Sequence, residues 1–228
     1  MTLYPFSGTF KVPNFRPFSG SSPPPPTPIS VVQVTTSNTT TLTFTNPTTK
    51  GNLLVVCIGA FNVAASTSGV TIGGSADNFA QAITPIAQGA CIGMMWADFD
   101  CGVSDTSVVV SGSNLVVSNG NGGLVAYEIA GTLTAFDTAS TLGTTGSSTW
   151  DSGTAPTTTK ANEIWVGMCE ANRAIASQPG AFTNVTVGAT PVMGAGYQIV
   201  STTGAPDYTG TLTGSDFACA AILPIRGF

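Results

Sequence analysis

Residues 48–62 read TTKGNLLVVCIGAFN, and residues 158–172 read TTKANEIWVGMCEAN. The two stretches carry identical residues at six positions with a constant spacing. The chain has only three lysines, and two of them, Lys50 and Lys160, fall at equivalent places, so a biased composition explains the match poorly. The pattern predicts that one structural unit occurs twice in the chain.

Strand-like runs extend this match beyond the two stretches. Apolar runs with a period of two, and continuous β-branched runs, alternate with Gly, Asn, Ser and Pro, which is typical of β-strands. The first copy has such runs at 53–61, 90–98, 106–111 and 123–130, and the second at 163–169, 193–200, 208–213 and 217–223. Trp96 and Tyr197 take equivalent places in the second run of each copy. The repeats therefore span about 45–130 and 155–225.

The remaining runs complete an all-β pattern. Further strands are expected at 31–36, at 41–44 and near 138–142, whereas helix is expected only as short turns near 76–81 or 170–175. Neither copy can bury its apolar face alone, so the two should pack as facing sheets. We predict one domain over residues 29–228, a jelly-roll-type β-sandwich of about ten strands built from an internal duplication.

Residues 1–28 form a different segment, which is rich in proline. Prolines at this density exclude helix and interior strand, and the run at 23–26 predicts a stiff polyproline spacer. A solvated tail is normally poor in aromatic residues. Five aromatic residues nevertheless precede the spacer: Tyr4, Phe6, Phe10, Phe15 and Phe18. We interpret the segment as an extended arm whose aromatic side chains dock in a neighbouring chain; the alternative is that it packs on its own domain.

Charge and hydropathy exclude several classes of protein. Charged residues make up 7% of the chain, the net charge is −5, and the basic residues are scattered, so no nucleic-acid partner is expected. No apolar run is long enough for a membrane span, and no basic amphipathic helix is present. The N-terminus lacks the basic and apolar regions of a secretory signal, so we expect synthesis and release in a host cytoplasm.

Metal-binding patterns are weak. The chain has five cysteines, no CxxC spacing and no histidine, so neither a zinc site nor any other cofactor is expected, and the cysteines are interpreted as small buried side chains. One acidic stretch, Asp98, Asp100 and Asp105 with an intervening glycine, has the alternating carboxylates that can wrap a calcium ion. It lacks the full loop and the bidentate Glu of an EF-hand, and a strand end followed by a polar turn is the favoured interpretation.

The sequence contains candidates for two further kinds of site, a hydrolytic carboxylate pair and a glycan-binding surface. Glu128 and Glu170 lie on or beside apolar strands, and a pair of carboxylates across a concave sheet can hydrolyse a glycosidic bond, but no spacing places these two opposite each other. A glycan-binding surface would stack sugars on aromatic rings. The candidates for such stacking are Trp96, Trp150, Trp165 and Tyr197. For Trp96 and Trp165 a place in the core is the favoured interpretation.

Several short patterns carry a resemblance to a known family. These are the strand opener Gly/Ala-Asn-x-Leu/Ile-x-Val at 51–56 and 161–166, Val-Ser-Gly-Ser at 110–113 and Leu-Val-Ala-Tyr-Glu-Ile-Ala-Gly at 124–131. Over about residues 45–225 the chain resembles the jelly-roll domains of tailed-phage virion surface proteins, which occur as capsid decoration proteins, head fibres and tail appendages. The resemblance implies a virion location and no catalytic residues.

Taken together, these features predict a non-enzymatic structural protein of a virus particle. We expect a decoration or appendage subunit on the virion surface, bound to capsid or tail proteins through residues 1–28. The scarcity of charged residues at strand edges favours a homo-oligomer that covers those edges, with a trimer as one option. The alternatives are a carbohydrate-binding module on a virion or bacterial surface and, less favoured, a glycoside hydrolase.

Overall fold

The computed structural model describes residues 25–61, 64–113, 115, 122–188 and 192–228. This part of the chain contains fifteen β-strands and no helix. All strand pairs are antiparallel, and the strands form three sheets. The predicted all-β class is therefore confirmed, with more strands than expected.

The three sheets differ in size and are named here by their place. The central sheet has the order β1 (Ser30–Ser37), β8 (Gly122–Ala130), β3 (Leu53–Ala60), β6 (Cys91–Asp98) and β5 (Ala80–Gln88). The C-terminal sheet has the order β10 (Ser140–Asp151), β15 (Thr209–Gly227), β11 (Glu163–Ala171), β14 (Val192–Val200) and β13 (Thr183–Val187), and β9 (Leu133–Phe136) and β12 (Ile175–Ser177) also pair with β15. The small sheet has the order β2 (Thr41–Thr43), β7 (Ser107–Ser113) and β4 (Ser66–Ile72).

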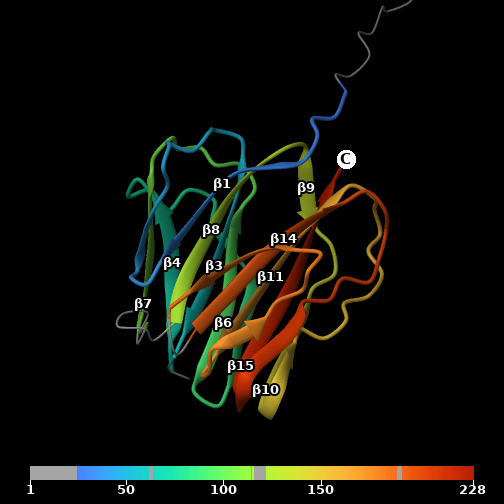
Figure 1. The fold of residues 1–228 in the computed structure, drawn as a ribbon. Helices are drawn as coiled ribbons and strands as arrows, with labels where there is room; N and C mark the ends of the chain where they lie inside the picture. Colours follow the sequence, from blue (N-terminus) through green and yellow to red (C-terminus); the bar gives the residue numbers. More distant parts are fainter. Residues whose placement is uncertain (1–24, 62–63, 114, 116–121, 189–191) are drawn as a thin grey trace, which may run out of the picture.

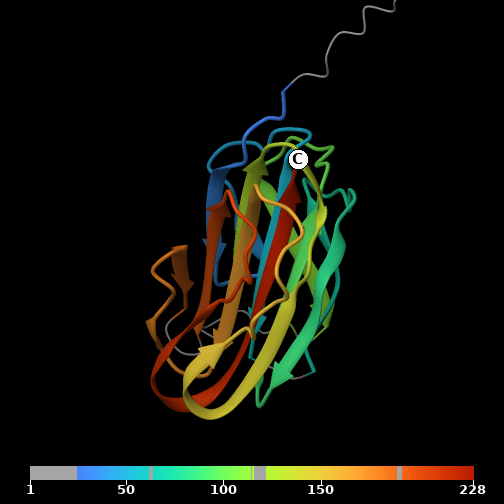
Figure 2. The ribbon, with the colours of Figure 1, turned by 90° about the vertical axis from the view of Figure 1, so that its right-hand side faces the viewer.

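The sheets stack as three layers, with the central sheet in the middle (Figures 1 and 2). One apolar core lies between the central and C-terminal sheets, and a second lies between the central and small sheets. A third core covers the outer face of the C-terminal sheet, where Trp150, Phe182 and Tyr208 pack against β11 and β15. The sandwich thus has one sheet more than the two facing sheets expected.

This layering explains why β3 is apolar on both faces. Leu53 and Val55 point into the core toward the C-terminal sheet, whereas Leu54 and Val56 point into the core toward the small sheet. Every residue of β3 is buried. A strand that is covered on both faces has a continuous run of hydrophobic residues in its sequence, instead of alternating hydrophobic and polar residues.

The structure corrects several sequence-based expectations. The separate strands expected at 208–213 and 217–223 are one strand, β15, because the chain stays extended through Gly214 and Ser215. The helical turn expected near 76–81 is a loop that leads into β5, and the one near 170–175 overlaps the end of β11 and the start of β12; the described residues form no helix at either place. Strands β4, β5, β9, β12 and β13 were not predicted.

The two larger sheets share a pattern of strand pairing around the TTK stretches. Strand β3 lies between β8 and β6, and β11 lies between β15 and β14. The Thr48 amide donates to the Asp105 carbonyl at 2.9 Å, and the Asp105 amide donates to Thr48 Oγ1 at 3.3 Å. Thr158 and Gly204 make the same reciprocal pair at 2.7 and 3.2 Å.

After these threonines the matched side chains of the two stretches face different cores. Val56 packs in the core between the central and small sheets, whereas Val166 packs in the core between the central and C-terminal sheets. Trp96 and Tyr197 likewise contact different cores. The pairing register is nevertheless kept, because Val56 lies opposite Trp96 and Val166 lies opposite Tyr197.

Both ends of the described chain lie at the same end of the sandwich (Figure 1). The Thr27 amide donates to Thr132 Oγ1 at 3.0 Å, and the Thr132 amide donates to the Thr27 carbonyl at 3.2 Å. Nearby, the Gly227 amide donates to the Asn162 carbonyl at 2.9 Å. The base of the proline-rich segment is thus attached to the domain beside the C-terminus.

Candidate functional site

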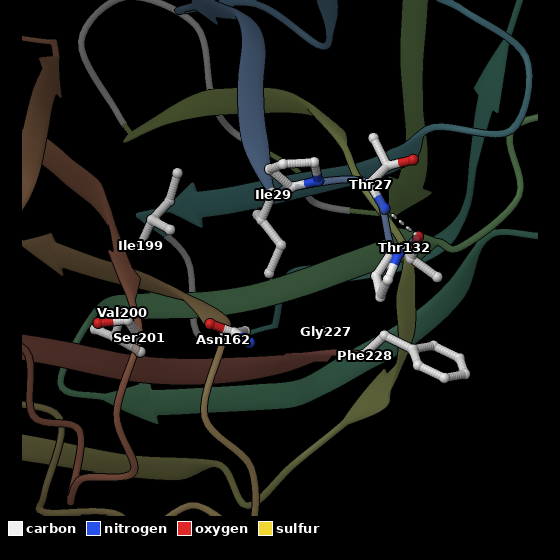
Figure 3. Close-up of a pocket in the computed structure, with 11 residues that line it drawn as sticks. Thr27, Ile29, Thr132, Asn162, Ile199, Val200, Ser201, Gly227 and Phe228 are labelled. Carbon is white, nitrogen blue, oxygen red and sulfur yellow. Dashed lines mark hydrogen bonds between the residues drawn. The ribbon is translucent and has the colours of Figure 1, made fainter. Parts of the chain in front are cut away.

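A hollow of about 440 Å³ adjoins the point where the described chain begins. Pro26, Pro28 and Ile29 contribute to its lining, together with Ile199 and Phe228 (Figure 3). Ile199 is 45% exposed and Phe228 is 74% exposed, which is unusual for large apolar side chains in this protein. An apolar hollow rimmed by exposed apolar side chains is typical of a contact surface.

The aromatic side chains expected to dock in a partner lie outside the described residues. Tyr4, Phe6, Phe10, Phe15 and Phe18 belong to residues 1–24, so the structure does not place them. Within the described part, residues 25–28 are exposed and extended up to β1. The spacer therefore joins the sandwich beside the apolar hollow.

A second candidate site is a cluster of three side chains, Asp77, Asp98 and Cys101. One potential ligand atom from each lies within 4.8 Å of the other two. Asp98 ends β6 on the face toward the small sheet and is fully buried, and Cys101 is also fully buried. Asp77 is partly exposed in the loop between β4 and β5, where its backbone has a left-handed φ of 41°.

Backbone amides position this cluster. The Asp100 amide donates to Asp98 Oδ1 at 3.0 Å, and the Gly102 amide donates to Asp77 Oδ2 at 2.6 Å. Burial raises the pKa of the Asp98 carboxyl above its ordinary value, the Asp100 amide lowers it, and the facing Asp77 carboxyl raises it again. A carboxyl in this position favours either a bound proton or a bound cation.

The calcium ligands proposed from spacing are divided by the fold. Of Asp98, Asp100 and Asp105, only Asp98 belongs to the cluster. Asp100 is exposed, and its carboxylate lies toward Gly51. Asp105 Oδ1 accepts a hydrogen bond from the Ser107 amide at 2.9 Å. The candidates from sequence therefore share only Asp98 with the cluster, and Asp77, which comes from a distant loop, was not among them.

The two glutamates considered as a hydrolytic pair lie on different sheets, Glu128 on β8 of the central sheet and Glu170 on β11 of the C-terminal sheet. Glu128 is fully buried and accepts hydrogen bonds from the Thr49 amide at 2.8 Å, Asn52 Nδ2 at 2.6 Å and Gln33 Nε2 at 2.6 Å. Glu170 is fully buried between the central and C-terminal sheets, against Gly59, and neither of its oxygens has a hydrogen-bond partner. The structure does not bring these carboxyls together around an open cleft.

The aromatic side chains considered for sugar stacking are mostly used inside the protein. Trp150 is 1% exposed and packs on Tyr208 with ring centroids 5.0 Å apart. Trp96 Nε1 donates to Thr67 Oγ1 at 2.8 Å, and Trp165 Nε1 donates to Glu163 Oε2 at 2.8 Å. Tyr197 makes an edge contact with the buried Tyr127 at 5.8 Å. These four residues are divided among three cores, with only Trp150 and Trp165 at the same one, and do not form one stacking surface.

All five cysteines are free and buried, in agreement with the expectation from sequence. Burial raises the pKa of the Cys91 thiol to about 12 and raises those of the other four as well. Since the thiolate is the nucleophile, these side chains are unreactive thiols in the absence of a bound metal.

Comparison with known proteins identified no relative of this chain. No family model matches the chain, and neither the search of curated proteins nor the search of solved structures found a match. In the part of the chain that the structure describes, no helix has the length and apolarity needed to cross a membrane.

Proposed function

We propose that this chain is a non-enzymatic structural protein of a virus particle, a decoration or appendage subunit that residues 1–28 attach to capsid or tail proteins. The observation that carries the proposal is the position of the arm. Its described end is attached beside the C-terminus, at one end of a long sandwich, next to the apolar hollow of Ile29, Ile199 and Phe228 (Figures 1 and 3). A domain attached at one end can project its other end away from a surface.

The proposed attachment is hydrophobic. Phe6, Phe10, Phe15 and Phe18 fill pockets on the partner, and each buried ring contributes roughly 1.5–3 kcal/mol. The hollow at the base of the arm adds a contact surface where the arm meets the domain. A homo-oligomer, such as a trimer, would engage several arms at once and gain avidity without new contacts.

The chemistry of the domain supports a structural role. The carboxyls that could perform acid–base catalysis, Glu128 and Glu170, are fully buried. The three tryptophans, Tyr127 and Tyr208 all pack in or against three apolar cores. The low proportion of charged residues leaves Ser, Thr and Asn to form the surface.

Deletion of residues 1–22 tests the attachment. We expect the shortened chain to keep the far-UV circular dichroism and melting temperature of the full chain, but to lose co-sedimentation with assembled particles. A full-length variant with Phe6, Phe10, Phe15 and Phe18 changed to Ala should fail in the same way, since it keeps the length of the arm. If either protein still decorates particles at the full occupancy of the unmodified chain, the arm is not the anchor.

We further propose that the domain is a jelly-roll-type sandwich that arose by duplication of one unit. Support comes from the shared pairing pattern of β3 and β11 and from the reciprocal hydrogen bonds of Thr48 and Thr158. Gly51 lies two residues before β3, Asn162 lies one residue before β11, and both have positive φ.

A further inference from the structure

The cluster of Asp77, Asp98 and Cys101 joins three segments of the chain. Asp77 comes from the loop between β4 of the small sheet and β5 of the central sheet, Asp98 ends β6, and Cys101 follows three residues later. We propose that these three side chains bind a divalent transition-metal ion of the zinc type, which fastens the loop to the end of β6. This inference is independent of the proposed function.

One atom of the cluster points to a ligand by itself. Asp98 Oδ2 is buried, belongs to a residue with no exposed surface, and has no hydrogen-bond partner. Its sister oxygen Oδ1 already accepts the Asp100 amide. A buried carboxylate oxygen without a donor is costly unless a proton or a cation meets it, and the same Asp98 carboxylate contributes one atom to the group with Asp77 and Cys101.

The charges around the cluster favour a cation. Asp105 places its carboxylate against Gly73 of the same loop that carries Asp77, and the exposed Asp100 follows Asp98 by two residues. Among the described residues the only ion pair joins Arg173 and Asp216, in another part of the domain. No basic side chain of the described residues therefore neutralises this acidic end.

The ligand types select the class of ion. Two carboxylate oxygens and one thiolate suit zinc or a similar borderline ion, whereas calcium takes oxygen ligands alone. Ligand atoms of a tetrahedral zinc site are about 3.5 Å apart, given bonds of about 2.0 Å to oxygen and 2.3 Å to sulfur. Atoms already within 4.8 Å of one another need only a small closure to reach this arrangement.

The protein also provides the support that such ligands need. The Gly102 amide fixes Asp77, and the Asp100 amide fixes Asp98. Such outer contacts orient ligands before an ion arrives. The partial exposure of Asp77 gives an ion a path to the buried members, and a solvent molecule can occupy the fourth position.

Cobalt(II) is the probe for the test, because it reports sulfur ligation through a charge-transfer absorption in the near ultraviolet. The full chain is stripped with a chelator under reducing conditions and titrated with Co²⁺. We expect this absorption to rise to one equivalent and to disappear when Zn²⁺ displaces the cobalt. Zn²⁺ at about a hundredfold excess over its Kd should raise the melting temperature by about 5–10 °C.

Variants assign the ligands. Cys101→Ser should abolish the charge-transfer absorption, and Asp98→Asn should abolish the thermal shift. Asp100→Asn, which removes the same charge from an exposed neighbour, and Cys169→Ala, which removes a buried thiol from another core, should leave both signals unchanged.

Three results would overturn the proposal. The first is a wild-type protein that shows neither signal at millimolar ion. The second is cobalt binding without sulfur absorption, which would mean an oxygen-only site. The third is a wild-type protein whose melting temperature does not change with added ions, while Asp98→Asn raises the melting temperature at neutral pH. In that case a proton shared between the carboxyls of Asp77 and Asp98 would explain why they face each other.

Discussion

Glu170 is the residue whose surroundings conflict most with its chemistry. It lies between the two larger sheets, fully buried, with no hydrogen-bond partner for either oxygen. Gly59 faces it from β3, and a Cβ at that position would overlap Glu170 Oε2, so the glycine leaves room for the carboxyl. Burial raises the pKa of this carboxyl well above its ordinary value of 4.5.

The sign of the pH effect follows from this shift. Above pH 4.5 the unfolded chain releases the Glu170 proton while the folded chain keeps it, so the contribution of this residue to stability falls as pH rises. The loss is about 1.4 kcal/mol for each pH unit until the folded pKa is reached. We therefore expect Glu170→Gln to stabilise the protein by up to about 3 kcal/mol at pH 7 and to have little effect near pH 4.

Urea denaturation at both pH values measures this effect, and Glu128→Gln is the matched control. Glu128 is equally buried but accepts three hydrogen bonds, and an amide would place a donor against the donors already present. The control should lose stability at pH 7. An effect of Glu170→Gln that is the same at both pH values would show that Glu170 is not a buried neutral acid.

Thr48 and Thr158 show how a loop is fixed before a strand begins. Each is buried and accepts a backbone amide from the segment that crosses it, Asp105 in one case and Gly204 in the other. Replacing either threonine with valine keeps the shape but leaves that amide unpaired. We expect each substitution to cost about 1–3 kcal/mol of unfolding free energy, measured by urea denaturation.

Thr49→Val is the control for this pair. Thr49 is exposed, and its contact with Glu128 uses the backbone amide, which valine retains. Its effect should stay within about 0.5 kcal/mol. If Thr158→Val is costly and Thr48→Val is neutral, the two loops are not equivalent, which would also weaken the case for a duplicated unit.

At the level of elements, burial decided which strands could be predicted from sequence. Strands β3, β6, β8 and β11 are covered on both faces and carry long apolar runs that indicate strands directly. Strands β4 and β5 carry small polar residues, and β5 contains Pro85 within a strand at the edge of its sheet, where bulges interrupt the pairing. Proline is tolerated at an edge, but it is a poor signal for a strand.

The candidate sites were predictable only where one segment supplied them. Asp98 was recognised because it ends an apolar run beside other carboxylates. Asp77 was not, because two strands, β5 and β6, separate it from Asp98 in sequence, and it reaches the cluster only through the stacking of the small sheet on the central sheet. The apolar hollow beside Ile29 was not predicted either, since it combines residues from both ends of the described chain.

At the level of the whole molecule, each pair of neighbouring sheets packs around a common apolar core. Strand β3 of the central sheet contributes side chains to two cores, and so does β11 of the C-terminal sheet. If one layer detached, it would expose an apolar face of the next layer, which is strongly unfavourable. Residues 29–228 should therefore unfold in one cooperative transition, as one domain would.

The three tryptophans allow this prediction to be tested. Trp96 packs at the core between the central and small sheets, and Trp150 packs at the core on the outer face of the C-terminal sheet. Two proteins that each retain one of these residues, with the other tryptophans changed to phenylalanine, report on opposite layers. In each protein, the urea midpoint from fluorescence should coincide with that from far-UV circular dichroism. If Trp96 fluorescence changes at lower urea than the circular dichroism signal, the small sheet separates first and the three layers are not one cooperative unit.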